Sequence, residues 1–309
     1  MDYNNYMARA NKGQHKIPRT YLQSFTDSQG KLWIGDKDFK LYSRKPDEIL
    51  TEHDYFTIKF PTGGGTLLIE TKYLNDIEGA YATIFRDKIS KKELVSNEEK
   101  AKLSIFVASM MARQPNRRES LKKFFKDGEE QITHLISLPD HIKKRAGSMI
   151  LHDKTAPTIS ADEFLRAGKD ISSLHSSLIP NAVESSAPII FNMQWVFMVR
   201  PNEANPFITS DNPCIMVNPV AENKFGRGTM GASPGLRQND VELTLPLSPD
   251  ITLMIGWQSK TNCQYINIPL ELVDEVNRRT RRHAKTIIGS DKTMIERIVQ
   301  RTKAYYQSK

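Results

Sequence analysis

The sequence has few cysteines and no long apolar run. Cys214 and Cys263 are its only cysteines, too few for a disulfide framework or a four-thiolate zinc site. No apolar run reaches the roughly 20 residues that cross a bilayer, and the stretch 1–14 lacks the apolar centre of a signal peptide. We therefore expect a reduced, soluble, cytoplasmic protein with no membrane partner.

Complete catalytic signatures are also missing. The triple glycine at 63–65 is not followed by Gly-Lys-Ser/Thr, which excludes a phosphate-cradling P-loop there. No Gly-x-Ser-x-Gly elbow occurs, and no two of the seven histidines have the spacing of a zinc-ligand pair. Any site must therefore be assembled from dispersed residues.

Positive charge is the first feature that is present in excess. The formal net charge is +8, which favours nucleic acid or another phosphorylated ligand as a partner, although a merely solvated basic surface fits as well. The densest cluster runs from Arg278 to Lys285 on a predicted helix, and we select Arg278, Arg281 and Arg282 as candidate nucleic-acid contacts.

The order of the predicted elements indicates an α+β fold, with a helical middle layer on a mostly antiparallel sheet and helices at the C-terminus. We expect one large domain over 1–309, with sub-layers at 1–190 and 191–309. Pro180 and Pro188 leave the segment 170–194 undecided. Strands are predicted at 31–34, 39–42, 55–60, 195–199, 214–217, 241–245 and 251–257, and helices at 67–89, from 96, at 116–137, 140–152, from 160, at 270–288 and 292–306.

The turn Thr209-Ser-Asp-Asn-Pro213 stands between two apolar runs. Its Ser, Asp and Asn side chains can bond their own backbone, which is the structural interpretation. Asp211 can also present a carboxylate, because a simple turn needs only one or two such residues. With Glu78 it could bind a divalent metal ion, and with His15 it could share a proton. The sequence does not choose between these alternatives.

Three further residues are candidates for chemistry. The His15 imidazole could act as an acid, a base or a ligand, or simply hydrogen-bond a helix start. Glu78 lies beside the apolar stripe of a predicted helix, where a carboxylate is either paired or part of a site. Arg113 follows another apolar stripe and could be its partner, in a structural ion pair or in a site.

These residues belong to a longer series of motifs. The chain contains His15-x-x-Pro-Arg-x-Tyr-Leu-x-x-Phe25, Lys31-Leu-Trp-Ile-Gly-Asp-Lys37, Glu70 with Glu78, Arg113 before Pro115, Phe207-Ile-Thr-Ser-Asp-Asn-Pro213, Leu245-Pro-Leu-Ser-Pro249 and Asn277-Arg-Arg-Thr280. In this order they resemble the uncharacterised prokaryotic and phage family called domain of unknown function 4238. Gln114 stands where the family pattern suggests a threonine before the proline. The resemblance implies a soluble protein and groups the four candidates in one pattern, but it brings no established reaction.

Two functions follow from this pattern. The first is a hydrolase of a phosphodiester or other phosphorylated substrate, with His15, Glu78, Arg113 and Asp211 as catalytic residues and a metal ion held by Glu78 and Asp211. Its expected substrate contacts are Arg19, Tyr21, Ser210 and Asn212. The alternative is a non-catalytic module that binds nucleic acid or a protein through the basic C-terminal helix. Whether the chain is an enzyme stays open at this point.

Overall fold

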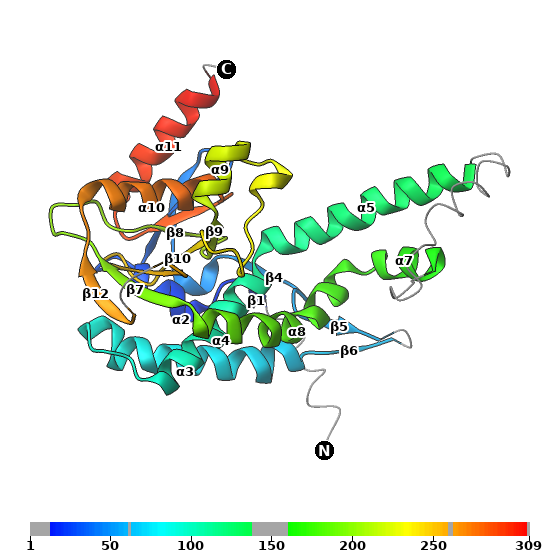
Figure 1. The fold of residues 1–309 in the computed structure, drawn as a ribbon, viewed down its shortest axis with the longest axis horizontal. Helices are drawn as coiled ribbons and strands as arrows, with labels where there is room; N and C mark the ends of the chain where they lie inside the picture. The colour runs from blue at the N-terminus through cyan, green and yellow to red at the C-terminus, as the bar shows by residue number, and fades with distance from the viewer. Residues whose placement is uncertain (1–12, 61–62, 138–159, 259–261, 308–309) are drawn as a thin grey trace.

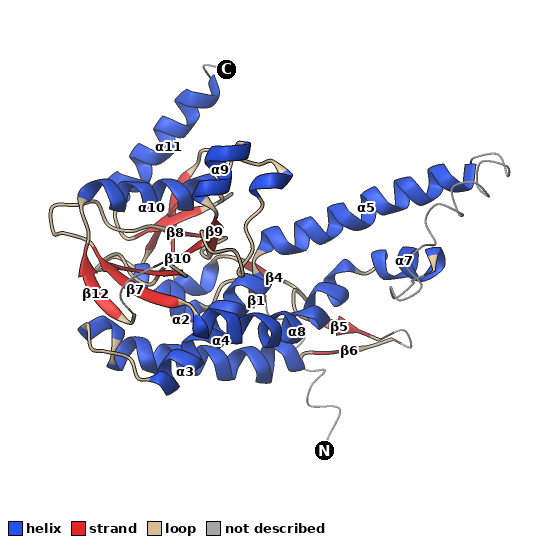
Figure 2. Cartoon of the chain, viewed as in Figure 1, coloured by secondary structure: helices blue, strands red, loops and turns tan. Residues whose placement is uncertain are grey.

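The computed structural model describes residues 13–60, 63–137, 160–258 and 262–307. A largely helical middle lies between strand-rich parts of the chain, and the sheets are mostly antiparallel, so the fold is α+β as predicted (Figure 2). In these ranges no helix is both long enough and apolar enough to span a membrane.

The larger sheet has five strands in the order β12-β7-β11-β10-β9. All neighbours are antiparallel except β12, which runs parallel to β7. The four strands predicted after residue 194 are all present. The strands are β7 (Gln194–Val199), β9 (Ile215–Val217), β10 (Glu242–Pro246), β11 (Ile251–Gly256) and β12 (Gln264–Asn267).

A second, four-stranded antiparallel sheet joins the two ends of the chain. Its order is β3 (Leu41–Arg44), β2 (Leu32–Gly35), β13 (Ile287–Gly289) and β8 (Thr209–Ser210). The predicted N-terminal hairpin is confirmed, with its strands displaced by one or two residues. The helix predicted over 270–288 was too long, because α10 (Leu270–Arg282) ends at Arg282 and the buried residues of β13 pair between two strands.

The helical layer contains α3 (Asn75–Asp87), α4 (Asn97–Arg113) and α8 (Ile171–Asn192). A π-helical segment, η3 (Ile69–Leu74), precedes α3, so the helix predicted over 67–89 is present but changes its winding. The predicted capping box of Ser96 and Glu99 starts α4. The undecided segment 170–194 forms α8, which continues through Pro180 and Pro188.

Two helices project from this layer and form an arm. It is formed by α5 (Pro115–Ser137) and α7 (Ala161–Gly168), and Figure 1 shows both extending away from the body. Ser160 and Glu163 form the predicted cap of α7. The helix predicted over 140–152 lies outside the described residues.

The remaining elements are short or C-terminal. These elements are β1 (Gln14–His15) paired with β4 (Thr51–Glu52), β5 (Ile58–Lys59) paired with β6 (Gly65–Thr66), α2 (Arg19–Leu22), α9 (Pro219–Phe225) and α11 (Lys292–Gln307). The strand predicted at 55–60 is reduced to the two residues of β5.

The principal core lies between the helical layer and the larger sheet. Its buried cluster includes Tyr21 from α2, Phe106 from α4 and Trp195 from β7, so it draws on both the N-terminal and C-terminal parts of the chain. The rings of Tyr81 and Phe106 stack with centroids 3.8 Å apart. This packing fixes α3 against α4, where two of the predicted site residues lie, Glu78 and Arg113.

Candidate functional site

A polar cluster forms around Arg113, the last residue of α4. Its guanidinium donates hydrogen bonds to the carbonyl oxygens of Lys16 (2.8 Å) and His15 (2.6 Å) and to the Glu78 carboxylate (2.5 Å). The Arg113 side chain is only 2% exposed, and its guanidinium lies 5.0 Å from the Phe56 ring centroid. Arg113 therefore ties α4 to β1 and α3.

The local sequence explains why α4 ends at this arginine. Gln114 has an extended backbone conformation (ψ 139°), as expected for a residue before proline, and Pro115 then starts α5. The Gln114 side chain donates to the carbonyl oxygen of Cys214 at 2.9 Å. Gln114 therefore links the helix junction to the residue that precedes β9.

Two titratable neighbours of Arg113 have shifted pKa values. Burial lowers the pKa of His15, so its imidazole is neutral near pH 7, and its Nε2 atom is buried without a hydrogen-bond partner among the described residues. Burial raises the pKa of Glu70, and the nearby Glu78 adds to the rise, while Gln14 and Arg113 oppose it. The cluster thus contains a neutral base and a carboxyl that takes up a proton readily.

The contribution of Glu70 was not assigned from the sequence. Its spacing of eight residues from Glu78 was the available signal, but regular α-helical winding would separate the two residues by roughly 80° around the axis. Because Glu70 lies in the π-helical segment, the winding differs from that projection, and the two carboxylates interact.

The Thr209–Pro213 turn forms a different network. Tyr21 donates to the carbonyl oxygen of Pro246 (2.6 Å) and shares a hydrogen bond with the Thr209 hydroxyl (2.7 Å). Asp211 Oδ1 accepts from the backbone N–H groups of Lys285 (3.0 Å) and Thr286 (3.2 Å). Burial raises the pKa of Asp211, and these hydrogen bonds oppose the rise.

Asn212 connects the same turn to two helices. Its Oδ1 accepts from the N–H of Asn116 at the start of α5 (3.2 Å), and its Nδ2 donates to the carbonyl oxygen of His283 (3.2 Å). Asp211 and Asn212 together therefore hold residues 283–286, which follow directly after α10. The turn acts as a joint between α5, α10 and β13.

The structure brings His15, Glu78 and Arg113 together, but it places Asp211 in the other network. Asp211 is 5% exposed and makes no hydrogen bond with any of the other three. Within the described ranges, no group of three or more His, Cys, Asp or Glu side chains is placed to hold a metal ion. The two carboxylates of Glu78 and Asp211 make no contact with each other. A metal ion held by both therefore stays a prediction.

The expected substrate contacts are also divided. Arg19 is exposed at the start of α2. Tyr21 and Ser210 are fully buried and Asn212 is 3% exposed, so none of these three side chains has an open face in this structure. Substrate contact by them stays a prediction.

A basic surface lies on α10 and α11. The stretch 278–303 holds nine Lys and Arg residues against two Asp and Glu, so it carries most of the net charge of +8. Arg281 donates to the Thr302 hydroxyl at 2.9 Å, which joins the two helices. Five exposed cations of this surface make no ion pair or hydrogen bond through their side chains within the described part of the chain: Arg282, Lys285, Arg297, Arg301 and Lys303.

A cavity of about 360 Å³ opens beside this surface, between α9 and α10. Arg227, Arg282 and His283 line it, together with Glu222, which pairs with Arg227 at 2.8 Å. The pKa of Arg282 is lowered by burial and by the neighbouring guanidinium groups, Arg227 first. Arg282 thus stands among like charges without a counter-charge bonded to it.

A family model described as protein of unknown function (DUF4238) matches residues 13–293. The chain belongs to this family. The DUF4238 match includes the polar cluster, the Thr209–Pro213 turn and all of α10, whereas Arg297, Arg301 and Lys303 of α11 lie beyond it. No curated protein and no solved structure matches the chain.

Proposed function

We propose that this DUF4238 protein binds a polyanion, nucleic acid in the first place, through α10 and α11. The observation that carries the proposal is the set of five exposed cations without a partner among the described residues. A cation that already pairs with a carboxylate is largely neutralised, so it attracts a phosphate only weakly. These five are free to contact one, and contacts of this kind release counterions from nucleic acid.

The chemistry of the residues supports phosphate as the ligand group. Arg282 presents a planar donor fork, which matches phosphate oxygens in two parallel hydrogen bonds. Its guanidinium is surrounded by those of Arg227, Arg278 and Arg281. A bound anion would relieve that repulsion, so the surface gains more from the ligand than isolated lysines would.

In this proposal the Thr209–Pro213 turn has a positioning role. Asp211 fixes the backbone of Lys285 and Thr286, and Asn212 fixes that of His283. The loop after α10 therefore presents its cations from a set position. The turn serves binding through the surface that it holds, without touching the ligand.

The test compares two variants that each remove three cations. Replacing three of the unpaired cations, Arg282, Lys285 and Arg301, by alanine should weaken binding of a labelled oligonucleotide and reduce the slope of log K against log salt by about two to three. The matched control replaces Lys72, Lys91 and Lys92 by alanine, which removes the same charge from exposed positions outside both the basic surface and the arm. Equal losses in both variants, at unchanged thermal stability, would mean that only net charge matters and would overturn the proposal.

A second candidate, hydrolysis of a phosphorylated substrate, is favoured by the contacts of His15, Glu70, Glu78 and Arg113. In this reading His15 moves a proton, and Glu70 supplies or takes up another. Incubating the wild-type protein with oligonucleotides and phosphate esters, with and without Mn²⁺, tests it directly. Turnover that disappears in Glu70→Gln supports it, and no turnover under any of these conditions removes it.

We also propose a cytoplasmic location. Both cysteines are free thiols, and Cys214 is buried in an apolar environment that raises its pKa. Mass spectrometry of alkylated protein from cells should find both cysteines reduced.

A further inference from the structure

Helix α5 is unusual among the long helices of this chain. It has 23 residues, a length of about 35 Å, yet none of its described side chains is buried. Figure 1 shows it leaving the body, with α7 alongside and no other labelled element beside its outer part. Most of the stability of a helix in a protein comes from packing of its apolar face, so a covering surface is expected.

The pairing of α5 with α7 is specific. The Phe164 ring lies against Gly128, where a Cβ atom would clash with it, and a Cβ on Gly168 would lie 3.0 Å from the Phe125 ring. The rings of Phe125 and Phe164 have centroids 4.6 Å apart. Each helix thus offers a glycine to the other's phenylalanine, which fixes α7 on one side of α5.

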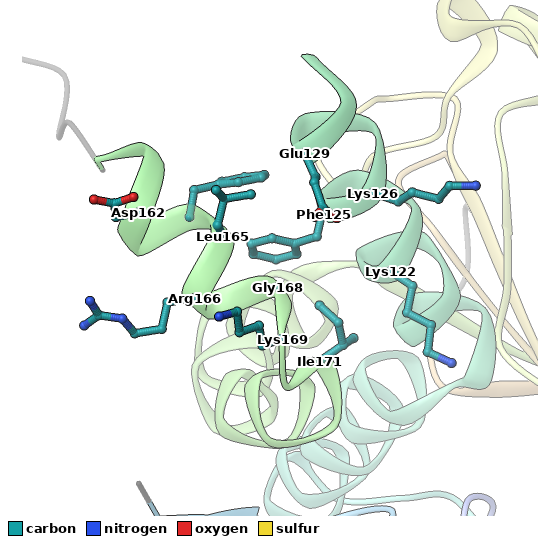
Figure 3. Close-up of a pocket in the computed structure, with 11 residues that line it drawn as sticks. Lys122, Phe125, Lys126, Glu129, Asp162, Leu165, Arg166, Gly168, Lys169 and Ile171 are labelled. Atoms are coloured by element: carbon teal, nitrogen blue, oxygen red, sulfur yellow. The ribbon is translucent and has the colours of Figure 1, made fainter. Parts of the chain in front are cut away.

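The rest of the arm leaves apolar surface uncovered. Phe124 is 61% exposed, although its ring lies only 5.7 Å from that of Phe164. A cavity of about 770 Å³ opens between the helices, and its lining includes Phe125, Leu165 and Ile171 together with six charged residues (Figure 3). An exposed aromatic on the same arm as an open cavity of mixed apolar and charged lining fits a protein–protein contact.

The charges along α5 indicate what covers this surface. Residues 117–126 carry five cations and one acid, whereas residues 127–130 carry three acids and no cation. Three of the five cations already pair within the chain, and Arg117 and Lys123 form no ion pair among the described residues. Phe124 stands close to the point where the sign reverses. A helix of this kind is complementary to itself when two copies lie antiparallel, because each basic half then faces an acidic half.

We propose that the arm pairs with the arm of a second copy of this chain, antiparallel, about a twofold axis close to Phe124. In this arrangement Phe124 of each copy packs against the other arm and its cavity. Lys123 of one copy faces Asp127 of the other, and symmetry makes every such pair occur twice. The interface is separate from the polyanion surface and does not depend on it.

The mass of the 309-residue chain in solution tests this directly. Sedimentation or light scattering at micromolar concentration should give twice the chain mass of 35.3 kDa. Phe124→Ser should give the monomer mass. The matched control is Leu94→Ser, which removes a 68% exposed apolar side chain outside the arm and should leave the dimer intact.

A charge exchange tests the antiparallel arrangement. Lys123→Glu alone and Asp127→Lys alone should each raise the dissociation constant of the dimer on the order of tenfold, because each creates two like-charge contacts. The chain with both substitutions should return to the wild-type value. A monomeric wild type, or a dimer that survives Phe124→Ser, overturns the proposal, and failure of the double substitution to restore pairing overturns the antiparallel arrangement.

Discussion

Helices α4 and α5 are consecutive in the chain and separated only by the bend at Gln114, but their surroundings are opposite. Ten of the 17 residues of α4 are buried, whereas no described side chain of the 23-residue α5 is. The stacked rings of Tyr81 and Phe106 fix α4 in the core, while Phe124 on α5 lies in solvent. Packing is therefore concentrated in α4, and α5 keeps uncovered surface, where we propose that a second copy binds.

The largest difference is expected for the cations of the two helices. Arg113→Ala should cost about 3–5 kcal/mol of unfolding free energy, because it leaves Glu78 and two carbonyl groups without their partner. Lys126→Ala should change it by less than about 0.5 kcal/mol, since Lys126 is 75% exposed. Urea unfolding measures both, and similar costs would show that the contrast between the helices is wrong.

A slightly smaller difference is expected for the aromatic residues. Phe106→Ala should cost about 3–4 kcal/mol, because it removes a buried ring and leaves a cavity against Tyr81. Phe124→Ala should stay within about 0.5 kcal/mol. Measuring at a concentration where the protein is monomeric separates this result from the loss of arm pairing. A large cost of Phe124→Ala in the monomer would place α5 in the stable core.

The third effect is a loss of stability at low pH, and it concerns the buried contact between α8 and the end of α4. His175 on α8 bonds the carbonyl oxygen of Ala112 near the end of α4, and burial lowers its pKa to about 4. The unfolded chain therefore binds a proton near pH 6.5 that the folded chain binds only near pH 4. Up to about 3 kcal/mol of stability should be lost as pH falls through this window.

His175→Gln provides the control, because a glutamine does not titrate. Its unfolding free energy should fall less steeply between pH 6.5 and 4 than that of the wild type. Parallel curves for the two proteins would contradict a neutral, buried His175.

The sequence predicted the elements well and their long-range contacts poorly. Capping residues such as Ser96 and Ser160 and the alternation of apolar residues are local signals, so the helices and most strands were foreseen. The end of α10 was not, because it depends on Asp211 and Asn212, some 70 residues earlier, and on β13 entering a sheet. The local periodicity of apolar residues does not indicate which distant residues contact a segment or which strands it pairs with.

The candidate site divides in the same way. Pairing of Glu78 with Arg113 was foreseen as one alternative, since the carboxylate lay beside one apolar stripe and the arginine followed another. The role of Asp211 as a joint was the structural alternative of its turn, but its partners at Lys285 and Thr286 lie beyond any motif spacing. No role was assigned to Glu70 from the sequence, because Glu70 lies in a π-helical segment and a regular α-helix would place it away from Glu78.

The most direct test of the central claim measures wild-type binding to a labelled oligonucleotide over a series of salt concentrations. If α10 and α11 contact phosphates through their unpaired cations, binding is present at low salt, and log K falls linearly with log salt with a slope of about −4 to −5 for five contacts. No binding at low salt, or binding that salt does not weaken, would contradict the claim.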